Sequence, residues 1–150
     1  MKNIDLSLYL IFQASKINKL QDILSVLAIS GVSMFQLREK NITDTEFMKY
    51  AIEAKKILDE FNASLIINDN VYITKNINAT GLHIGQSDIS LTEARNILGN
   101  NVIIGLSVNN EDEFPQDISL ADYISSHVFP STTKVNKEYI GLEKLKILRA

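Results

Sequence analysis

The sequence contains no cysteine, which excludes disulfide bonds, thiolate nucleophiles and cysteine-ligated metals and allows a reducing compartment. It also lacks an apolar run near the ~20 residues that span a bilayer, and residues 1–5 do not lead into a signal-peptide core. Basic residues are not in excess, since the formal net charge is -3, which argues against broad binding to nucleic acid or anionic membranes. We therefore expect a cytoplasmic protein without a nucleic-acid or membrane partner.

A length of 150 residues with 45% hydrophobic and 22% charged residues is typical of one globular domain, which we expect to span residues 1–150. Residues 8–12 show no polar alternation, as in a strand buried on both faces of a parallel sheet. Apolar segments of this kind predict strands at residues 8–12, 34–37, 65–69, 81–85, 102–108 and 121–125.

Apolar side chains at helical spacing predict helices at residues 19–30, 43–62, 71–78, 90–99, 109–119 and 141–150. Thr43 with Glu46, and Ser90 with Glu93, have the form of capping boxes at two of these helix starts. Pro115 removes a backbone donor, so we expect the helix at 109–119 to be short or kinked.

Strands and helices alternate with short connections, which indicates an α/β fold with a parallel sheet. A doubly wound sheet and a β/α barrel both fit this order. No Gly-x-Gly-x-x-Gly or Walker-type loop is present, which lowers the odds of a nucleotide-binding doubly wound fold. Polar residues gather at the carboxyl ends of the predicted strands, which share one mouth in a barrel. We therefore predict a parallel β/α barrel of the TIM type, incomplete, with about six of its eight units.

The segment Phe-Gln-Leu-Arg-Glu-Lys at residues 35–40 closes the second predicted strand. Gln36, Arg38 and Lys40 alternate with apolar residues, and we expect them on a polar face opposite Met34, Phe35 and Leu37. An amide, a guanidinium and an ammonium side by side suit a phosphate or a diphosphate. The simpler interpretation is an edge strand with a solvated, charged face.

In a barrel, polar residues from other strands would meet these three at the same mouth. They are Asn68 and Asp69 from the third strand, His83 from the fourth, Ser107 from the fifth, and Asp88 and Lys134 from the following loops. Mg²⁺ prefers one or two carboxylates together with phosphate oxygens. Asp69 and Asp88 therefore predict a Mg²⁺ and diphosphate site.

Each of these residues also has a simpler interpretation. Residues 68–70 fit a turn that caps the next helix, and Asp88 fits a turn of its own. His83 lies between apolar neighbours, as a hydrogen-bonded core histidine does. Residues 131–134 have the composition of an exposed loop.

Five segments, in their order and spacing, resemble the successive motifs of thiamine-phosphate synthases across residues 8–145. They are Phe-Gln-Leu-Arg-Glu-Lys at 35–40, Leu-Ile-Ile-Asn-Asp at 65–69, Gly-Leu-His-Ile-Gly-Gln-Ser-Asp at 81–88, Ile-Gly-Leu-Ser at 104–107 and Val-Phe-Pro-Ser-Thr-Thr-Lys at 128–134. The resemblance implies a β/α barrel that uses Mg²⁺ to join hydroxymethylpyrimidine diphosphate to thiazole phosphate, giving thiamine phosphate and pyrophosphate.

The same resemblance implies a role for each matched residue. Asp69 and Asp88 would ligate Mg²⁺. Arg38 and Lys134 would be catalytic, because they would stabilise the charge that gathers on the leaving pyrophosphate. The residues holding the diphosphate would be Gln36, Arg38, Lys40, Asn68, Ser107 and Lys134, and those holding the thiazole phosphate would be Ser131, Thr132 and Thr133.

The chain departs from the family pattern at several points. Residues 12–13 read Phe-Gln where the family usually has Thr-Asp, and residues 125–128 read Ser-Ser-His-Val where it usually has Gly-x-Gly-Pro. A His-Val-Phe at this place is similar to the related thiazole tautomerases, which leaves open a tautomerase-like isomerase that uses His127. A complete barrel takes roughly 200 residues or more, so we expect two units to be missing and activity to be doubtful.

A non-catalytic protein of the same fold that binds diphosphate is the remaining alternative. In either case the first and sixth strands would present open edges, which invite pairing with another chain. We therefore expect a homo-oligomer formed through these edges, acting on small-molecule substrates.

Overall fold

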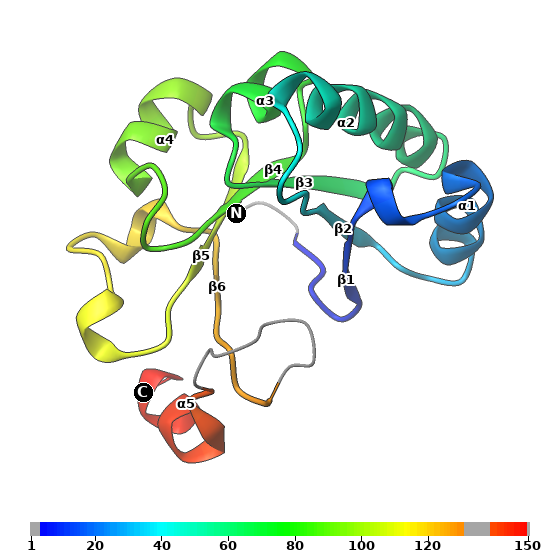
Figure 1. Cartoon of the computed structure of the whole chain (residues 1–150). Helices are drawn as coiled ribbons and strands as arrows, with labels where there is room; N and C mark the ends of the chain where they lie inside the picture. Colours follow the sequence, from blue (N-terminus) through cyan, green and yellow to red (C-terminus); the bar gives the residue numbers. More distant parts are fainter. Residues whose placement is uncertain (1–3, 131–138, 150) are drawn as a thin grey trace.

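The computed structural model of the protein describes residues 4–130 and 139–149. Its centre is one sheet of six parallel strands, each paired with its neighbour in the chain (Figure 1). The strands are β1 (Tyr9–Phe12), β2 (Met34–Leu37), β3 (Ser64–Asn68), β4 (Gly81–Ile84), β5 (Ile103–Ser107) and β6 (Tyr123–Ser125). The predicted α/β fold, a parallel barrel that is incomplete, is confirmed.

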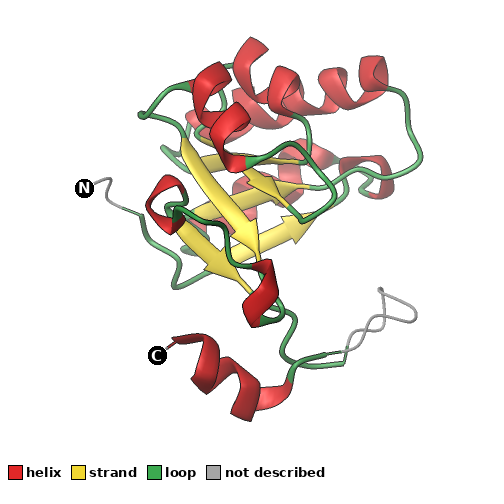
Figure 2. Cartoon of the chain, turned by 90° about the vertical axis from the view of Figure 1, so that its left-hand side faces the viewer, coloured by secondary structure: helices red, strands yellow, loops and turns green. Residues whose placement is uncertain are grey.

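The first four α-helices lie along the outer side of the curved sheet, and the last lies beyond β6 (Figures 1 and 2). The helices are α1 (Leu20–Ile29), α2 (Asp44–Asp59), α3 (Val71–Asn76), α4 (Leu91–Leu98) and α5 (Gly141–Arg149). Within the described residues, no helix combines the length and the apolar character needed to cross a membrane.

The side chains of β2 alternate between the two sides of the sheet. Phe35 and Leu37 pack outward among the helices, whereas Met34 packs inward against Ile66 and Tyr123. Gln36 shares the inward face with Met34 by the period of two along a strand, and it is 2% exposed. The expectation that Gln36 faces away from Met34 is therefore wrong, and β2 is a paired central strand rather than an edge.

Both predicted capping boxes are present. The backbone N–H of Glu46 donates to the Thr43 hydroxyl at 3.2 Å, while the Glu46 carboxylate accepts from the Thr43 N–H at 3.0 Å. Ser90 and Glu93 form the same reciprocal pair at the start of α4. These local contacts fix where two helices begin after their strands.

Two elements differ from the sequence prediction. Residues 109–119 do not form an α-helix but two short 3-10 turns, Glu111–Glu113 and Ile118–Leu120, on either side of Pro115. β1 is buried on its outer face, where Leu10 and Phe12 join the helices, and not on its inward face. Its residue Ile11 is 57% exposed.

A half-buried arginine ties the amino ends of β5 and β6 together. The guanidinium of Arg95 on α4 contacts the Asp122 carboxylate at 2.6 Å and donates to the carbonyl oxygens of Leu120 and Val102. Asp122 also accepts from the backbone N–H of Ile104 on β5 at 2.8 Å. The Arg95 side chain thus provides hydrogen bonds to carbonyl groups on both sides of a connection that contains no α-helix.

Candidate active site

The carboxyl ends of β2 and β3 bring two predicted site residues into contact. Lys40, just after β2, donates from Nζ to Oδ2 of Asp69, just after β3, at 2.6 Å. The Lys40 and Asp69 side chains are 45% and 30% exposed, so a ligand at this edge of the sheet can reach both.

The turn that carries Asp69 is held from both sides. Asp69 has a φ of 65°, a left-handed conformation that aspartate tolerates better than bulkier residues, and its N–H donates to the His83 carbonyl at 2.8 Å. Next to it, Asn70 accepts from the Ile73 N–H at 2.9 Å and so caps α3. The simpler interpretation of this segment as a helix-capping turn is confirmed, and the turn also aims Asp69 at the mouth of the sheet.

Asp88 folds back onto the end of β4, where its Oδ2 accepts from the Gly85 N–H at 2.7 Å. Burial raises the pKa of the Asp88 carboxyl and the neighbouring Asp69 carboxylate raises it further, whereas the Gly85 hydrogen bond and Lys40 oppose the rise. The two acids are therefore adjacent, and the Asp69 carboxylate disfavours the ionisation of Asp88. A divalent cation between them would remove this repulsion.

The three predicted diphosphate donors in and just after β2, Gln36, Arg38 and Lys40, do not lie on one surface. Gln36 is buried on the inward side and donates from Nε2 to Tyr9 Oη at 2.7 Å. Arg38 is half-buried, and within residues 4–130 and 139–149 its guanidinium makes no hydrogen bond or ion pair. Asn68 is buried at the end of β3, opposite His83 in the register of the sheet.

His83 is a buried, hydrogen-bonded histidine, as its simpler interpretation predicted. Its Nδ1 lies 3.0 Å from Tyr123 Oη and its Nε2 lies 3.0 Å from Ser107 Oγ. The His83 and Tyr123 rings stack with their centroids 5.6 Å apart. Ser107, one of the predicted site residues, is thereby joined to the interior of the sheet.

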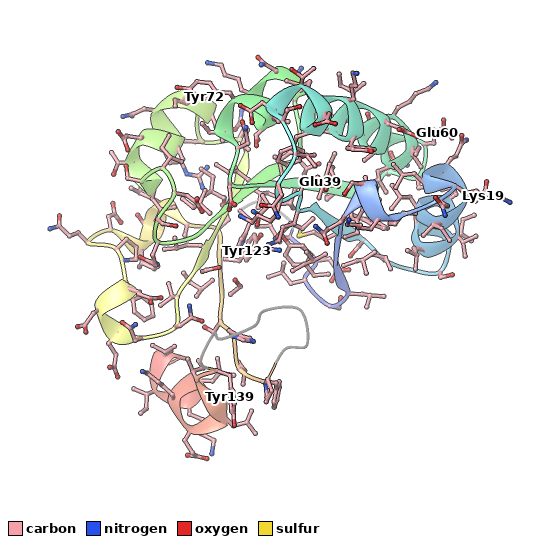
Figure 3. The ribbon with its side chains drawn as sticks, in the orientation of Figure 1. Lys19, Glu39, Glu60, Tyr72, Tyr123 and Tyr139 are labelled. Carbon is pink, nitrogen blue, oxygen red and sulfur yellow. The ribbon has the colours of Figure 1, made fainter. Side chains whose placement is uncertain are left out.

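Sequence reasoning missed three residues of this interior, Tyr9, Tyr123 and Gly105. Tyr123 lies near the middle of the molecule (Figure 3), and its Oη is 2.7 Å from Tyr9 Oη. A Cβ at Gly105 would fall 2.0 Å from the Tyr123 ring, so glycine is required where this ring crosses β5. The alternation of side chains along β1 and β6 was the available signal, because an inward-facing phenol needs a partner.

The remaining predicted site residues are Ser131, Thr132, Thr133 and Lys134, which lie outside the described residues. His127 donates from its backbone N–H to Asn109 Oδ1 at 2.9 Å. Both of its ring nitrogens are buried and have no partner within the described part of the chain. That part also holds no cluster of three or more metal-ligating side chains, so Asp69 and Asp88 stand as a pair.

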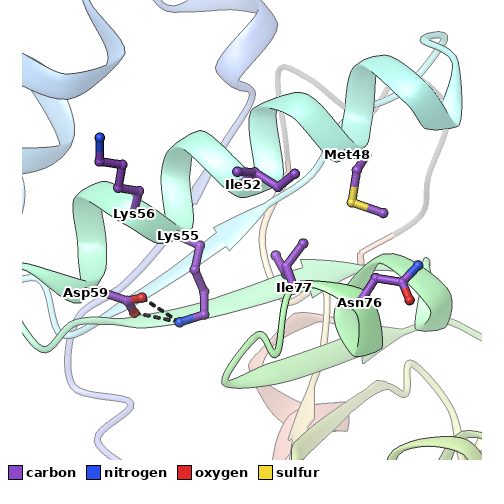
Figure 4. Close-up of a pocket in the computed structure, with 7 residues that line it drawn as sticks. All are labelled: Met48, Ile52, Lys55, Lys56, Asp59, Asn76 and Ile77. Atoms are coloured by element: carbon purple, nitrogen blue, oxygen red, sulfur yellow. Dashed lines mark hydrogen bonds and ion pairs between the residues drawn. The ribbon is translucent and has the colours of Figure 1, made fainter.

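Among the hollows on the surface of the described residues, one adjoins α2 and another adjoins Asp69. The larger, about 570 Å³, lies between α2 and the end of α3 and is lined by residues such as Met48, Ile52 and Ile77 (Figure 4). The Lys55–Asp59 ion pair at 2.6 Å lies on its wall, and none of the predicted site residues does. The smaller, about 290 Å³, is lined in part by Asp69 and Tyr72, and it therefore adjoins the predicted site.

Comparison with known proteins gives one consistent result. The chain is 38% identical to the thiamine-phosphate synthase of Clostridium tetani, over 99% of this chain and 73% of that protein. It is 40% identical to the thiamine-phosphate synthase of Leptospira biflexa, over 88% of this chain and 66% of that protein. The chain thus spans about two thirds to three quarters of the length of these relatives.

A solved structure, thiamine phosphate pyrophosphorylase from Pyrococcus furiosus, superposes with a TM-score of 0.77 and 26% identity. The superposition covers 94% of this chain and 68% of that one. The family model described as thiamine monophosphate synthase matches residues 8–150. Because this family model matches nearly the whole chain and the relatives are 38–40% identical to it, the chain belongs to the thiamine monophosphate synthase family.

Proposed function

We propose that this chain is a transferase that couples hydroxymethylpyrimidine diphosphate to thiazole phosphate, giving thiamine phosphate and pyrophosphate. The observation that carries the proposal is the meeting of Lys40, Asp69 and Asp88 at the carboxyl edge of the sheet. Two adjacent carboxylates beside an ammonium suit a divalent cation that shares its coordination with a diphosphate. The family membership agrees with this assignment.

The residues present fit Mg²⁺ through the oxygens of Asp69 and Asp88. Bound there, the ion would supply positive charge to the diphosphate oxygens. The Lys40 ammonium pairs with Asp69 in the described chain. Once Asp69 binds the cation, the ammonium would be released from this pair and would contact the diphosphate instead. Arg38 follows β2 at the same edge and offers a guanidinium that no described residue engages.

In the proposed reaction, the bond between the pyrimidine methylene carbon and the diphosphate oxygen breaks, and its electron pair leaves with the pyrophosphate. The thiazole nitrogen then gives its lone pair to that carbon, so no general base is required. Arg38 and Lys134 would stabilise the charge on the leaving group, and Ser131, Thr132 and Thr133 would hold the thiazole phosphate.

One second candidate rests on a specific observation. Most of the proposed donors for a cation and a diphosphate come from residues 36–88, a continuous part of the described chain, with Ser107 and Lys134 as the exceptions. A chain that keeps these donors without completing the thiazole-phosphate site would bind diphosphate and not turn over. The tautomerase alternative finds less support, because the relatives that the chain matches are thiamine-phosphate synthases.

The test is product formation from both substrates with Mg²⁺, against an Asp69→Ala control. Turnover that disappears in the control would support the transferase. A chain that melts cooperatively, gives no product and is stabilised by Mg²⁺ with pyrophosphate would instead support the diphosphate-binding candidate. A chain without product or stabilisation would contradict both.

A further inference from the structure

A continuous row of hydrogen-bonding side chains crosses the inward side of the sheet. It begins at Gln36 Nε2, which lies 2.7 Å from Tyr9 Oη, and continues over 2.7 Å to Tyr123 Oη. From there it reaches His83 Nδ1 at 3.0 Å and leaves the imidazole at Nε2 towards Ser107 Oγ, again at 3.0 Å. The row therefore joins β2, β1, β6, β4 and β5 in turn.

The hydrogens in this row are not independent of one another. A phenol has one hydrogen to donate, and a neutral imidazole has one protonated and one unprotonated nitrogen. Burial raises the pKa of Tyr9 and of Tyr123, so both phenols keep their hydrogens. Each donor in the row thus determines which way the next hydrogen points.

The direction follows from the first member. The Gln36 amide nitrogen only donates, so the Tyr9 hydroxyl accepts from it. Tyr9 then gives its own hydrogen to Tyr123, because accepting from Tyr123 as well would leave the Tyr9 hydrogen without a partner among the described residues. Tyr123 then donates to His83 Nδ1, which must be unprotonated, and the imidazole proton sits on Nε2 and points to Ser107. Ser125 Oγ lies farther from Nε2, at 3.3 Å, so the shorter bond goes to Ser107. The Ser107 hydroxyl accepts this bond and keeps its own hydrogen for another acceptor, which is either a bound anion or Ser125 Oγ at 3.3 Å.

We propose that Gln36, Tyr9, Tyr123 and His83 form a directed hydrogen-bond relay that sets the His83 tautomer and leaves the Ser107 hydroxyl as a donor towards bound anions. The proposal rests on the proposed function only for the identity of that anion, the diphosphate. Tyr9 and Tyr123 are positioning residues in it, since they act on Ser107 through the imidazole.

The relay also couples two distant strands. If the amide of Gln36 turned its oxygen to Tyr9, every hydrogen in the row would reverse, His83 would carry its proton on Nδ1, and Ser107 would donate inward to Nε2. If only part of the row reversed, at least one buried hydrogen or lone pair in it would lose its hydrogen-bond partner, which is energetically unfavourable. A ligand that holds Gln36 in one orientation would therefore also fix the donor at Ser107, on the other side of β3 and β4.

The tautomer of His83 tests the relay without any substrate. Long-range imidazole nitrogen–proton NMR spectra distinguish Nε2–H from Nδ1–H, and the chain has 2 histidines, so a His127→Gln variant assigns the signals. At a pH where His83 is neutral, we expect the Nε2–H form in the unliganded chain. A predominant Nδ1–H form would overturn the proposed direction.

Two substitutions then separate the relay from mere packing. Tyr9→Phe removes one hydroxyl and should shift His83 to a mixture of tautomers, whereas Tyr50→Phe on α2, a matched control outside the row, should not. Gln36→Glu in its ionised form only accepts, so it should reverse the population to Nδ1–H. An unchanged tautomer in both relay variants, with native spectra elsewhere, would overturn the proposal.

Ligand binding adds a separate readout. With Mg²⁺ and inorganic pyrophosphate, Tyr9→Phe should weaken binding by about two- to tenfold, the effect of losing one well-placed hydrogen bond. If wild type does not bind pyrophosphate but the tautomer pattern holds, the proposed function fails and the relay stands. If wild type binds and the tautomers do not respond, the relay fails alone.

Discussion

Tyr9 and Tyr123 share a 2.7 Å hydrogen bond although they belong to the first and the last strand of the sheet. Their rings meet edge to face with centroids 5.8 Å apart. Among the described strands, β1 and β6 are the two edges that lack a second neighbour. The pair therefore connects both edges across the inward side, where a closed barrel would be filled by layers of side chains.

Gly105→Ala should disrupt this connection. The new Cβ would lie 2.0 Å from the Tyr123 ring, so the ring must move, and overpacking of this kind costs about 1–3 kcal/mol of unfolding free energy. Chemical denaturation measures the loss. In a Tyr123→Ala background the same substitution should cost much less, because the obstructing ring is gone, and equal costs in both backgrounds would contradict the packing described.

Asp88→Asn should make the chain more stable at neutral pH. The folded-state pKa of Asp88 is raised above the ordinary value of 3.8, so its contribution to stability is present below that value and is lost as pH rises through the folded pKa. Asparagine keeps an oxygen for the Gly85 N–H but carries no charge. Melting temperatures of variant and wild type should therefore agree at acid pH and separate as the pH rises.

Mg²⁺ with pyrophosphate should reverse this order. Wild type should gain melting temperature because the ion removes the repulsion between Asp69 and Asp88, while Asp88→Asn should gain little. An equal gain in both proteins would show that Asp88 does not hold the ion.

Lys40→Met should separate binding from stability. The Lys40–Asp69 pair is partly exposed, so its loss should change the unfolding free energy by less than about 1 kcal/mol. Pyrophosphate affinity, measured by calorimetry with Mg²⁺, should fall by about tenfold or more, since hydrogen bonds to charged groups are the stronger ones. Lys56→Met on α2 is the control that should leave affinity unchanged.

Arg95→Ala should be strongly destabilising. Asp122 and two carbonyl groups would lose a partner in a place where the arginine and aspartate side chains are only 10% and 19% exposed. Breaking a buried pair in this way costs about 3–5 kcal/mol, against less than about 0.5 kcal/mol for Lys55→Ala in the exposed pair on α2. A similar small effect of both substitutions on urea denaturation would refute this role of Arg95.

We propose that the chain self-associates through its open edges, and exposed apolar side chains near β1 support this proposal. Leu8, just before β1, and Ile11 on β1 are 50% and 57% exposed, and Val26 and Ile29 on α1 are 61% and 73% exposed. We expect sedimentation velocity to show association that grows with concentration. Val26→Glu should reduce it and Ile52→Glu on α2 should not, whereas a wild-type monomer at all concentrations would contradict the proposal.

Local signals explain what the sequence predicted well. The Thr43 and Ser90 capping boxes depend on side chains three residues apart, and both helices begin as predicted. The sequence predicts that Asp69 and Asp88 lie together, because both follow strands that end at one edge of a parallel sheet. Their adjacency in the structure agrees with that reasoning.

Two failures have different physical causes. At residues 109–119, the side chains of Asn110 and Asp117 accept hydrogen bonds from nearby N–H groups, which competes with helix formation around Pro115. The link between Tyr9 and Tyr123 depends instead on the register of six strands and on a missing Cβ at Gly105. No pattern within a short window carries that information.

The sequential strand order also has a consequence for folding kinetics. Every strand pairs in parallel with its neighbour in the chain, so each pairing must close a loop that contains a whole connecting segment, which is slower than forming a hairpin. The contact between Tyr9 and Tyr123 spans 114 positions and needs both edges in place. Closing this contact therefore has a larger loop-closure entropy cost than pairing any two neighbouring strands.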